Sequence, residues 1–280
     1  MAQLRGIAIA AAALFCAVVP AMAQTAPPLG LVQQFGALGG AGVTGSTGLG
    51  TTINGDVGSS PTPTITNFPP SKTVPPFIVH LANDAFVQQA HLDAITAYNN
   101  LFNQGTGAGA TLLGPQLSGV ILGPGVYRFA VAADLAASGV LTLNDPSAGK
   151  TGIFIFSVGS SLTENVLSSV VGTANPCNVY WQVGTSATLN GNNFFGTVIA
   201  DQSVAVASSN NLTGRVVGVN AAVTMPGAGG NTIGGCNVAG LAGPPPSGPA
   251  GGPTLDAVGM SILLVLLAAA GVFAVNRFTT

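Results

Sequence analysis

The sequence contains very little charge. Only 5% of its 280 residues are Asp, Glu, Lys or Arg, and the formal net charge is −2. Ordinary soluble domains carry roughly 25% charged residues. No stretch forms a basic stripe, which argues against nucleic acid as a partner. A surface so poor in charge has to be covered by Thr, Ser, Asn, Gly and Ala, and it carries no large electric field.

Residues that perform catalysis are equally scarce. The chain has two histidines, His80 and His91, and a single glutamate, Glu164. On one helix the two histidines would lie about 16 Å apart, too far to share a metal ion. We expect His80 to pair with Asp84 on the helix surface. Without a zinc spacing, a phosphate loop or a Ser-His-Asp pattern, the sequence predicts no enzyme, no metal and no cofactor.

Two isolated charged residues have structural explanations. Asp56 follows Asn54-Gly55, so we expect it to close a turn by accepting hydrogen bonds from backbone amides. Arg215 is the lone basic residue between Lys150 and Arg277. We expect Arg215 to pair with an acid or with carbonyl oxygens at a corner of the fold.

The N-terminal residues have the pattern of a secretory signal. Arg5 precedes an apolar run, Pro20 breaks the run, and Ala21-Met22-Ala23 gives small residues at a cleavage site. We therefore predict a signal helix over residues 1–23 and an exported protein. In an exported protein the remaining even pair, Cys177 and Cys236, is expected to form a disulfide.

The C-terminal residues predict a membrane segment. Residues 257–275 carry no charge and are long enough to cross a bilayer as a helix, with Arg277 on the cytoplasmic side. A Pro/Gly linker over 243–253 precedes them. The order Pro253-Thr254-Leu255, apolar helix and Arg277 resembles the sorting signals of exosortase-type membrane proteases. That resemblance implies a sorting segment over 254–280 that can be removed, an exosortase-type partner, a link to exopolysaccharide, and display at the cell surface or release.

Between these ends, residues 24–242 suit a single β-rich domain. Similar short segments recur around Thr188, Ala205 and Thr224, at spacings of 17 (205 − 188) and 19 (224 − 205). Gly196 and Gly214 are 18 apart (214 − 196). This period favours the coils of a β-solenoid over a sandwich, whose strands recur every 8–12 residues or so.

One helix interrupts the strand-like pattern. Residues 79–102 show a helical period, with Pro75-Pro76 before them and Gly105 after them. The apolar residues expected on its packing side are Leu81, Ala85, Leu92, Ile95, Tyr98 and Phe102. We predict that this side covers the stack of strands.

The order of motifs resembles the secreted microbial ice-binding protein family. The residues that carry the resemblance are Ile53-Asn-Gly-Asp-Val-Gly58, Phe68-Pro69-Pro70, Ala97-Tyr98, Leu122-Gly-Pro-Gly-Val-Tyr127, Ile153-Phe-Ile-Phe156, the run from Cys177 through Trp181 to Leu189, Gly214-Arg215, Ala222-Val-Thr224 and Asn231-Thr-Ile233. The resemblance implies a mainly β fold, a discontinuous β-solenoid with one long α-helix packed alongside. It also implies an ice surface as the partner.

Strand alternation gives a candidate ice-binding face. If Leu189, Val206 and Met225 point inward, the preceding residues point outward. The candidate face is Ser186, Thr188, Ser203, Ala205, Ala222 and Thr224. A second candidate strip, near a corner, is Asn190, Asn193, Ser208 and Asn211.

The alternative function is a cell-surface or matrix adhesin that binds polysaccharide or protein. Trp181, Tyr180, Phe194 and Phe195 could form a sugar platform, but aromatic residues within strand patterns more commonly pack in a core. We expect core packing here, and we favour ice binding by a flat face of small residues.

Overall fold

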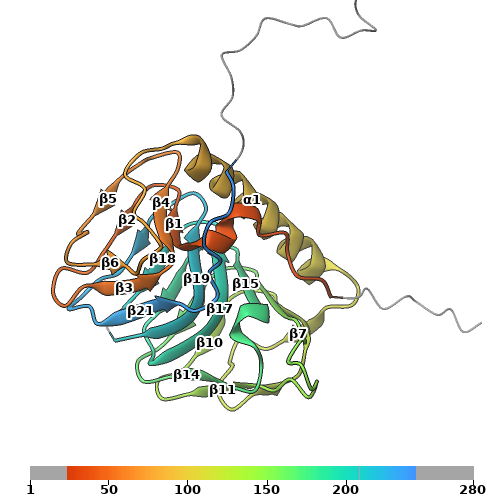
Figure 1. Cartoon of the computed structure of the whole chain (residues 1–280). Helices are drawn as coiled ribbons and strands as arrows, with labels where there is room; N and C mark the ends of the chain where they lie inside the picture. Colours follow the sequence, from red (N-terminus) through yellow and green to blue (C-terminus); the bar gives the residue numbers. More distant parts are fainter. Residues whose placement is uncertain (1–23, 208, 244–280) are drawn as a thin grey trace, which may run out of the picture. The chain divides into compact units, whose positions relative to one another are not determined.

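The computed structural model describes residues 24–207 and 209–243, in which parallel strands wind into a stack with one long helix beside it (Figure 1). The predicted signal segment 1–23 and sorting segment 254–280 lie outside the described residues, as does the linker after Gly243. The chain divides into a compact unit that ends at Gly243 and a second unit, Pro244–Thr280. Since the first unit contains its own cores, we expect it to fold alone.

The strands form three faces, of which one is a separate seven-stranded sheet. This sheet contains, in spatial order, β10 (Ala133–Leu135), β13 (Leu162–Glu164), β16 (Ala187–Leu189), β18 (Val204–Val206), β20 (Val223–Thr224), β2 (Val43–Thr44) and β5 (Ile65–Thr66).

A 14-stranded sheet bends to provide the other two faces. The helix face consists of β7 (Thr111–Leu113), β9 (Gly125–Phe129), β12 (Phe154–Val158), β15 (Val179–Val183), the second halves of β17 (Asn193–Ala200) and β19 (Asn211–Gly218), β1 (Phe35–Gly39) and β4 (Asp56–Ser59). The third face consists of β8 (Ile121–Leu122), β11 (Val140–Leu143), β14 (Ser169–Gly172), the first halves of β17 and β19, β21 (Asn231–Gly234), β3 (Thr51–Asn54) and β6 (Lys72–Thr73).

The order of the coils in space differs from their order in the chain. The first strands, β1 and β2, pair with β19 and β20 near the C-terminal end of the domain. The two N-terminal coils therefore stack on the last coil, and the helix lies in the connection to the remaining coils. The strands pair in parallel throughout these contacts, as a solenoid requires and a hairpin-built sandwich does not. The predicted mainly β architecture with one long helix is confirmed.

Glycines allow two strands to turn from the third face to the helix face. Gly196 in β17 and Gly214 in β19 lie opposite each other and have φ of 118° and 154°. A Cβ atom on Gly214 would come within 1.9 Å of the Gly196 carbonyl oxygen. Only glycine adopts this backbone while neighbouring coils approach so closely.

The interior of the stack is a continuous apolar core that contains the aromatic residues. Trp181 is fully buried, its ring lies 3.9 Å from that of Phe156, and its indole nitrogen donates to the Phe195 carbonyl oxygen (2.9 Å). Phe194 is buried in the same core and Phe195 is partly buried against it, whereas Tyr180 is buried in the second core, beneath α1. The expected core packing of these rings is observed, so they form no exposed sugar platform.

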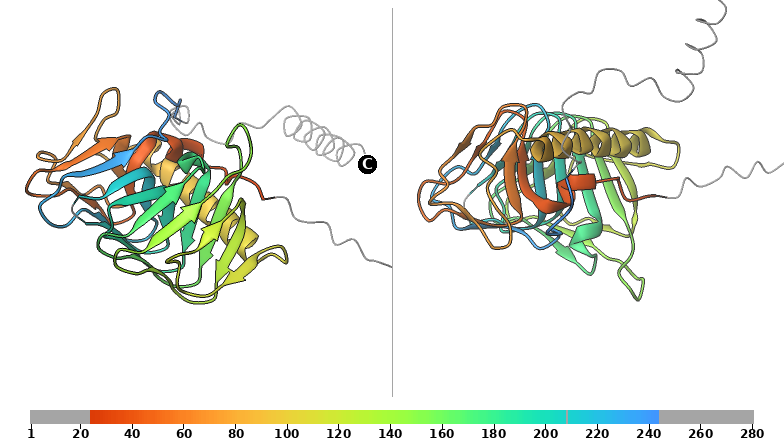
Figure 2. Two further views of the ribbon diagram at one scale, coloured as in Figure 1. Left: turned by 90° about the horizontal axis from the view of Figure 1, so that it is seen from below. Right: turned by 45° about the horizontal axis from the view of Figure 1, so that its top comes forward.

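Helix α1 (Ala85–Thr106) covers the helix face and lies lengthwise along the stack (Figure 2). The predicted range 79–102 was wrong at both ends. Asp84 is the N-cap and accepts from Val87 N (3.0 Å), which begins the helix six residues later than expected (85 − 79). Gly105 lies inside the last turn against Ser157 rather than after the helix.

The predicted packing side of α1 was only partly correct, since Ile95 and Tyr98 are partly buried against the core beneath the helix. Leu81, Leu92 and Phe102 are exposed. The side that contacts the strands is instead Val87, Ala90, Ala94, Ala97, Leu101 and Gly105. Small residues allow the helix to approach the strands closely, and the bulky Leu92 and Phe102 lie outside the contact. No helix within residues 24–207 and 209–243 combines the length and apolar character needed to cross a membrane.

The predicted disulfide is present and closes the compact unit. Cys177 lies in the short helix η2 (Pro176–Asn178), which leads into β15, and Cys236 follows β21. At the other end of the chain, η1 (Gly30–Gln34) packs against α1.

The close contact of α1 predicts a position-dependent effect of added volume. Ala97→Leu should lower the free energy of unfolding by about 1–3 kcal/mol, because the buried site has no room for a larger side chain. Thr96→Leu, on the exposed side of the same turn, should change it by at most about 0.5 kcal/mol. Urea unfolding of both variants measures the difference, and equal stabilities would contradict this packing.

Candidate functional face

The seven-stranded sheet presents a continuous outward row of residues. Thr163, Thr188, Ala205, Thr224, Thr44 and Thr66 occupy equivalent positions on six neighbouring strands. Parallel strands lie about 4.7–4.9 Å apart, so these side chains repeat at that spacing. Five of the six are threonines, each with one methyl and one hydroxyl group. We call these six residues the threonine row.

A second outward row flanks the threonine row. Its members precede the row residues by two positions and are Ser161, Ser186, Ser203, Ala222 and Thr64, while the sixth such position is the buried Gly42. Backbone hydrogen bonds continue the pairing through them, for example from Ala187 N to Ser203 O (2.9 Å). Ser203 Oγ also donates to Ser186 Oγ (3.0 Å). Both rows therefore consist of small residues on regularly paired strands.

The residues that follow the row residues along the strands point inward and support this face. Leu189, Val206 and Met225 are buried, as the alternation predicts. The six residues of the first candidate face accordingly lie together on adjacent strands, in the two rows. These inward side chains belong to the close-packed main core, so the backbone that carries the outward side chains is held rigidly.

A charged residue lies next to the threonine row, on the neighbouring strand β10. There Asp134 lies opposite Thr163. Its carboxylate accepts from Asn165 Nδ2 (2.9 Å) and Gln116 Nε2 (3.1 Å). The six members of the threonine row themselves carry no charge, so water above them is not strongly oriented.

The second candidate strip is divided by the structure. Asn193 and Asn211 lie opposite each other on the third face, where the same row continues to Thr232, Thr52 and Lys72. Asn190 follows β16 and belongs to the corner beside the seven-stranded sheet. Ser208 lies outside the described residues. The third face therefore mixes amides, a lysine and apolar side chains, and its chemistry is less regular.

Sequence reasoning missed the residues that extend the row. Thr44 and Thr66 come from the two N-terminal coils, and Thr163 precedes the repeats that were recognised. Thr66 Oγ1 donates to Thr44 Oγ1 (3.0 Å). The sequence does contain a signal for these residues, a Thr at the second position of a short strand. That signal identifies the row only when the position of the N-terminal coils in the stack is known.

The histidines have structural partners away from this face. His80 lies before α1 rather than on it, and its Nε2 contacts the buried Asp56 carboxylate (2.9 Å). Its Nδ1 is 3.7 Å from Asp84, so the expected His80–Asp84 pair exists, although at the helix entrance. Burial alone would lower the pKa of His80, but the hydrogen bond and charge of Asp56, with a contribution from Asp84, raise it. His91 contacts the Ser60 carbonyl oxygen, and burial lowers its pKa.

Asp56 differs from its predicted role. Instead of closing a local turn, it accepts from Ile78 N (2.8 Å) and Gln34 Nε2 (2.6 Å), both 22 residues away. Its oxygens therefore hold together the segments before and after the first coils. The sequence could not show this, because the partners are distant in the chain.

Arg215 is buried and bonds to uncharged oxygens. Its guanidinium donates to the carbonyl oxygens of Cys236 and Gln33 and to Thr197 Oγ1. Of the two expected partners, the carbonyl oxygens are the ones observed. Burial lowers its pKa to about 10, which leaves it charged at neutral pH. Within residues 24–207 and 209–243, no three His, Cys, Asp or Glu side chains gather as metal ligands.

Comparisons with known proteins agree on one family. The sequence model described as Ice-binding-like matches residues 37–230. An ice-binding protein of Nostoc sp. (strain HG1) is 38% identical over 214 residues, which cover 73% of this chain and 74% of that protein. A solved ice-binding protein from an Antarctic biological consortium has a TM-score of 0.67 at 33% identity, over 75% of this chain and 91% of that one. One from the Antarctic ascomycete Antarctomyces psychrotrophicus has a TM-score of 0.65 at 32% identity, over 75% and 98%.

The inward and outward assignment predicts opposite effects at adjacent positions. Leu189→Ala should lower the free energy of unfolding by about 2–5 kcal/mol, because it leaves a cavity in the core. Thr188→Ala should lower it by less than about 1 kcal/mol, since that side chain is exposed. Urea unfolding of the two variants provides the measurement, and the reverse ranking would contradict the alternation.

Proposed function

Because this chain belongs to the Ice-binding-like family, we propose that it binds ice through the threonine row and the small-residue row beside it. The observation that carries this assignment is the continuous register of small outward residues, five of six being threonine, across the seven-stranded sheet. Of the other two faces, one is covered by α1, and the other carries Lys72 and bulky apolar side chains. The seven-stranded sheet is thus the flat and chemically regular surface.

The binding mechanism follows from the two functional groups of threonine. The methyl groups, repeated at about 4.7–4.9 Å along the row, hold a cage of water over the face. The hydroxyl groups anchor this layer by hydrogen bonds. A water layer that is ordered on a rigid lattice can merge with the ice surface. Ala205 supplies an apolar group without a hydroxyl and interrupts the anchors at one strand only.

Adsorption of a rigid protein restrains the growth of ice. The ice front between adsorbed molecules becomes curved, which opposes further growth and recrystallisation. The chain performs no reaction in this scheme and needs no cofactor. Its named relatives are ice-binding proteins and not enzymes, which is consistent with a binding function.

The adhesin alternative has no support from the structure or the relatives. Its aromatic platform would require exposed rings, whereas Trp181 and Phe194 are buried. The reported relatives are named for binding ice.

We also propose that the protein is exported and acts outside the cell or at its surface. The support is the signal pattern of residues 1–23, the disulfide, and the sorting pattern at Pro253-Thr254-Leu255. An exosortase-type protease and exopolysaccharide as partners rest on the sequence resemblance alone. Mass spectrometry of the mature protein from its own host would identify both termini.

Ice-affinity partitioning of residues 24–243 tests the assigned face. The wild type should concentrate in a slowly growing ice front. Thr188→Lys should lower the partitioned fraction several-fold, because a long charged side chain disrupts the water layer between Thr163 and Ala205 of the row.

Asn211→Lys is the matched control, since it adds the same side chain to an exposed strand position on the third face. It should partition like the wild type. If Asn211→Lys is excluded from ice while Thr188→Lys is incorporated, the binding face is the third face. If the wild type itself is excluded like an inert protein, ice binding is not its function.

A further inference from the structure

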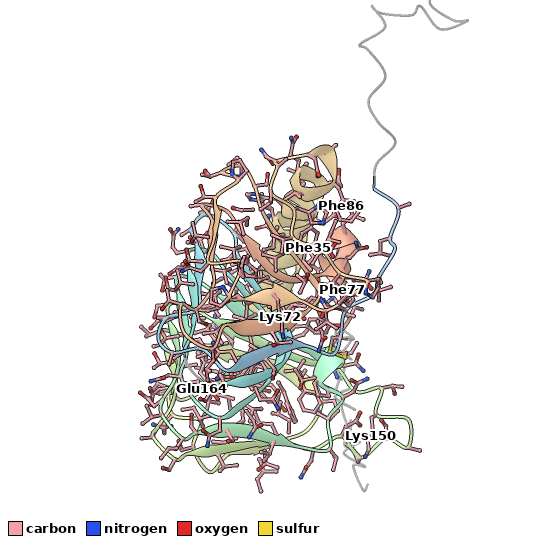
Figure 3. The ribbon with its side chains drawn as sticks, turned by 60° about the vertical axis from the view of Figure 1, so that its left-hand side comes forward. Phe35, Lys72, Phe77, Phe86, Lys150 and Glu164 are labelled. Carbon is pink, nitrogen blue, oxygen red and sulfur yellow. A yellow bond between two sulfur atoms is a disulfide. The ribbon has the colours of Figure 1, made fainter. Side chains whose placement is uncertain are left out.

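One buried side chain conflicts with the apolar pattern behind the threonine row. Glu164 ends β13 and is fully buried, although the residues opposite it on the neighbouring strands are Leu135 and Leu189. It is the only glutamate in the chain. Figure 3 shows it on the side of the stack away from Phe86 and the helix. An ionised carboxylate at a leucine position carries a large desolvation cost, so its presence requires a specific partner.

The partner is Asn210, which is also buried. Asn210 Nδ2 donates to Glu164 Oε2 (2.8 Å), and Gly191 N donates to the same oxygen (3.2 Å). Glu164 Oε1 and Asn210 Oδ1 are both buried without a hydrogen-bond partner. A proton on Glu164 Oε1 would allow these two oxygens to share one hydrogen bond. A protonated Oε1 would be a donor, for which Asn210 Oδ1 would be the acceptor, in addition to the observed bond from Asn210 Nδ2 to Oε2.

The hydrogen bonds continue from this pair into a buried polar column. Asn231 Oδ1 accepts from Asn210 N (3.2 Å), and Asn231 Nδ2 donates to Val206 O (3.1 Å) and Thr51 Oγ1 (3.5 Å). Thr51 Oγ1 and Ser46 Oγ are 2.8 Å apart. This column lies at the corner where successive coils pass from the seven-stranded sheet to the third face, and Glu164 directly follows Thr163 of the threonine row.

We propose that Glu164 is held as a neutral carboxylic acid paired with Asn210, and that this pair is a pH-sensitive positioning element for the ice-binding face. Gly191 closes the site, because a Cβ there would lie 2.3 Å from Glu164 Oε1. Loss of the proton leaves a negative charge in this buried corner, and Glu164 Oε1 and Asn210 Oδ1 then both lack a hydrogen-bond partner. The corner then opens, and the strands that carry Thr163 and Thr188 lose their fixed register. The positioning of the ice-binding face rests on the proposed function, whereas the neutral state of Glu164 does not.

The electrostatic surroundings agree with a neutral acid. Burial raises the pKa of Glu164 from its ordinary 4.5 to about 7, and the bonds from Asn210 and Gly191 offset only part of this rise. On neighbouring β10, Asp134 is the charged group, and it points outward. Among the described residues, no Lys, Arg or His contacts the carboxyl of Glu164. Protonated Glu164 therefore contributes its full stabilisation of the folded state below pH 4.5, and this contribution is lost as the pH rises through about 7.

A single-site NMR titration tests the proton directly. Because the chain has one glutamate, labelling with ¹³Cδ-glutamate gives one titrating side-chain carboxyl signal. In residues 24–243 we expect its midpoint near pH 7, against about 4.5 in urea-unfolded protein. A folded-state midpoint below about pH 5 would overturn the proposal.

Glu164→Gln tests the consequence, because an amide can form the same pair with Asn210 without a titrating group. The melting temperature of the wild type should fall by roughly 5 °C or more between about pH 5.5 and 8.5 relative to that of Glu164→Gln. Asp201→Asn, which removes a half-buried acid elsewhere, should retain the wild-type profile. Identical profiles for wild type and Glu164→Gln would overturn the proposal.

Ice partitioning over the same pH range separates the two claims. We expect partitioning of the wild type to fall at least about twofold at high pH, while that of Glu164→Gln stays constant. If both proteins adsorb to ice with the same pH profile, Glu164 does not position the face. If neither adsorbs, the proposed function fails, and the NMR midpoint still decides whether Glu164 holds its proton.

Discussion

In-register hydrogen bonding between parallel strands is the interaction on which this molecule depends. Parallel pairing places equivalent positions of successive coils opposite one another, so one choice of residue becomes a row that runs along the stack. Inward rows of Leu and Val form the core, and outward rows of Thr and Ser form a flat face. Because side chains alternate along a strand, a shift of one residue would turn every threonine into the core. The regularity of the outer surface is therefore a consequence of the apolar core.

The buried polar groups lie where this regular pairing has to end or turn. Arg215 bonds to carbonyl oxygens near Cys236, where the last coil ends, and Asp56 gathers the segments before and after the first coils. Glu164 lies at the corner behind the threonine row. In each case the side chain forms hydrogen bonds with backbone groups that have no partner in the strand pairing. Although the chain has few charged residues, Asp56, Glu164 and Arg215 are all buried in its interior.

The sequence predicted the parts of this structure that depend on local repetition. The spacing of Thr188, Ala205 and Thr224 fixed their shared row, because consecutive coils repeat the same short pattern. It did not reveal that β2 and β5 extend the row, since that depends on which coil the N-terminal segment stacks against. The contact side of α1 was only partly predicted, because tertiary packing decides which residues of the helix face the strands. Close packing selected Ala and Gly, whereas hydrophobicity pointed to Leu92 and Phe102.

The central claim is that the seven-stranded sheet is the surface in contact with ice. Solid-state NMR of methyl-labelled threonine in frozen solution measures this contact through magnetisation transfer from ice protons. The account predicts strong transfer to Thr44, Thr163, Thr188 and Thr224, and weak transfer to Thr52, Thr213 and Thr232 on the third face. Equal transfer to both groups, or stronger transfer to the third face, would contradict it.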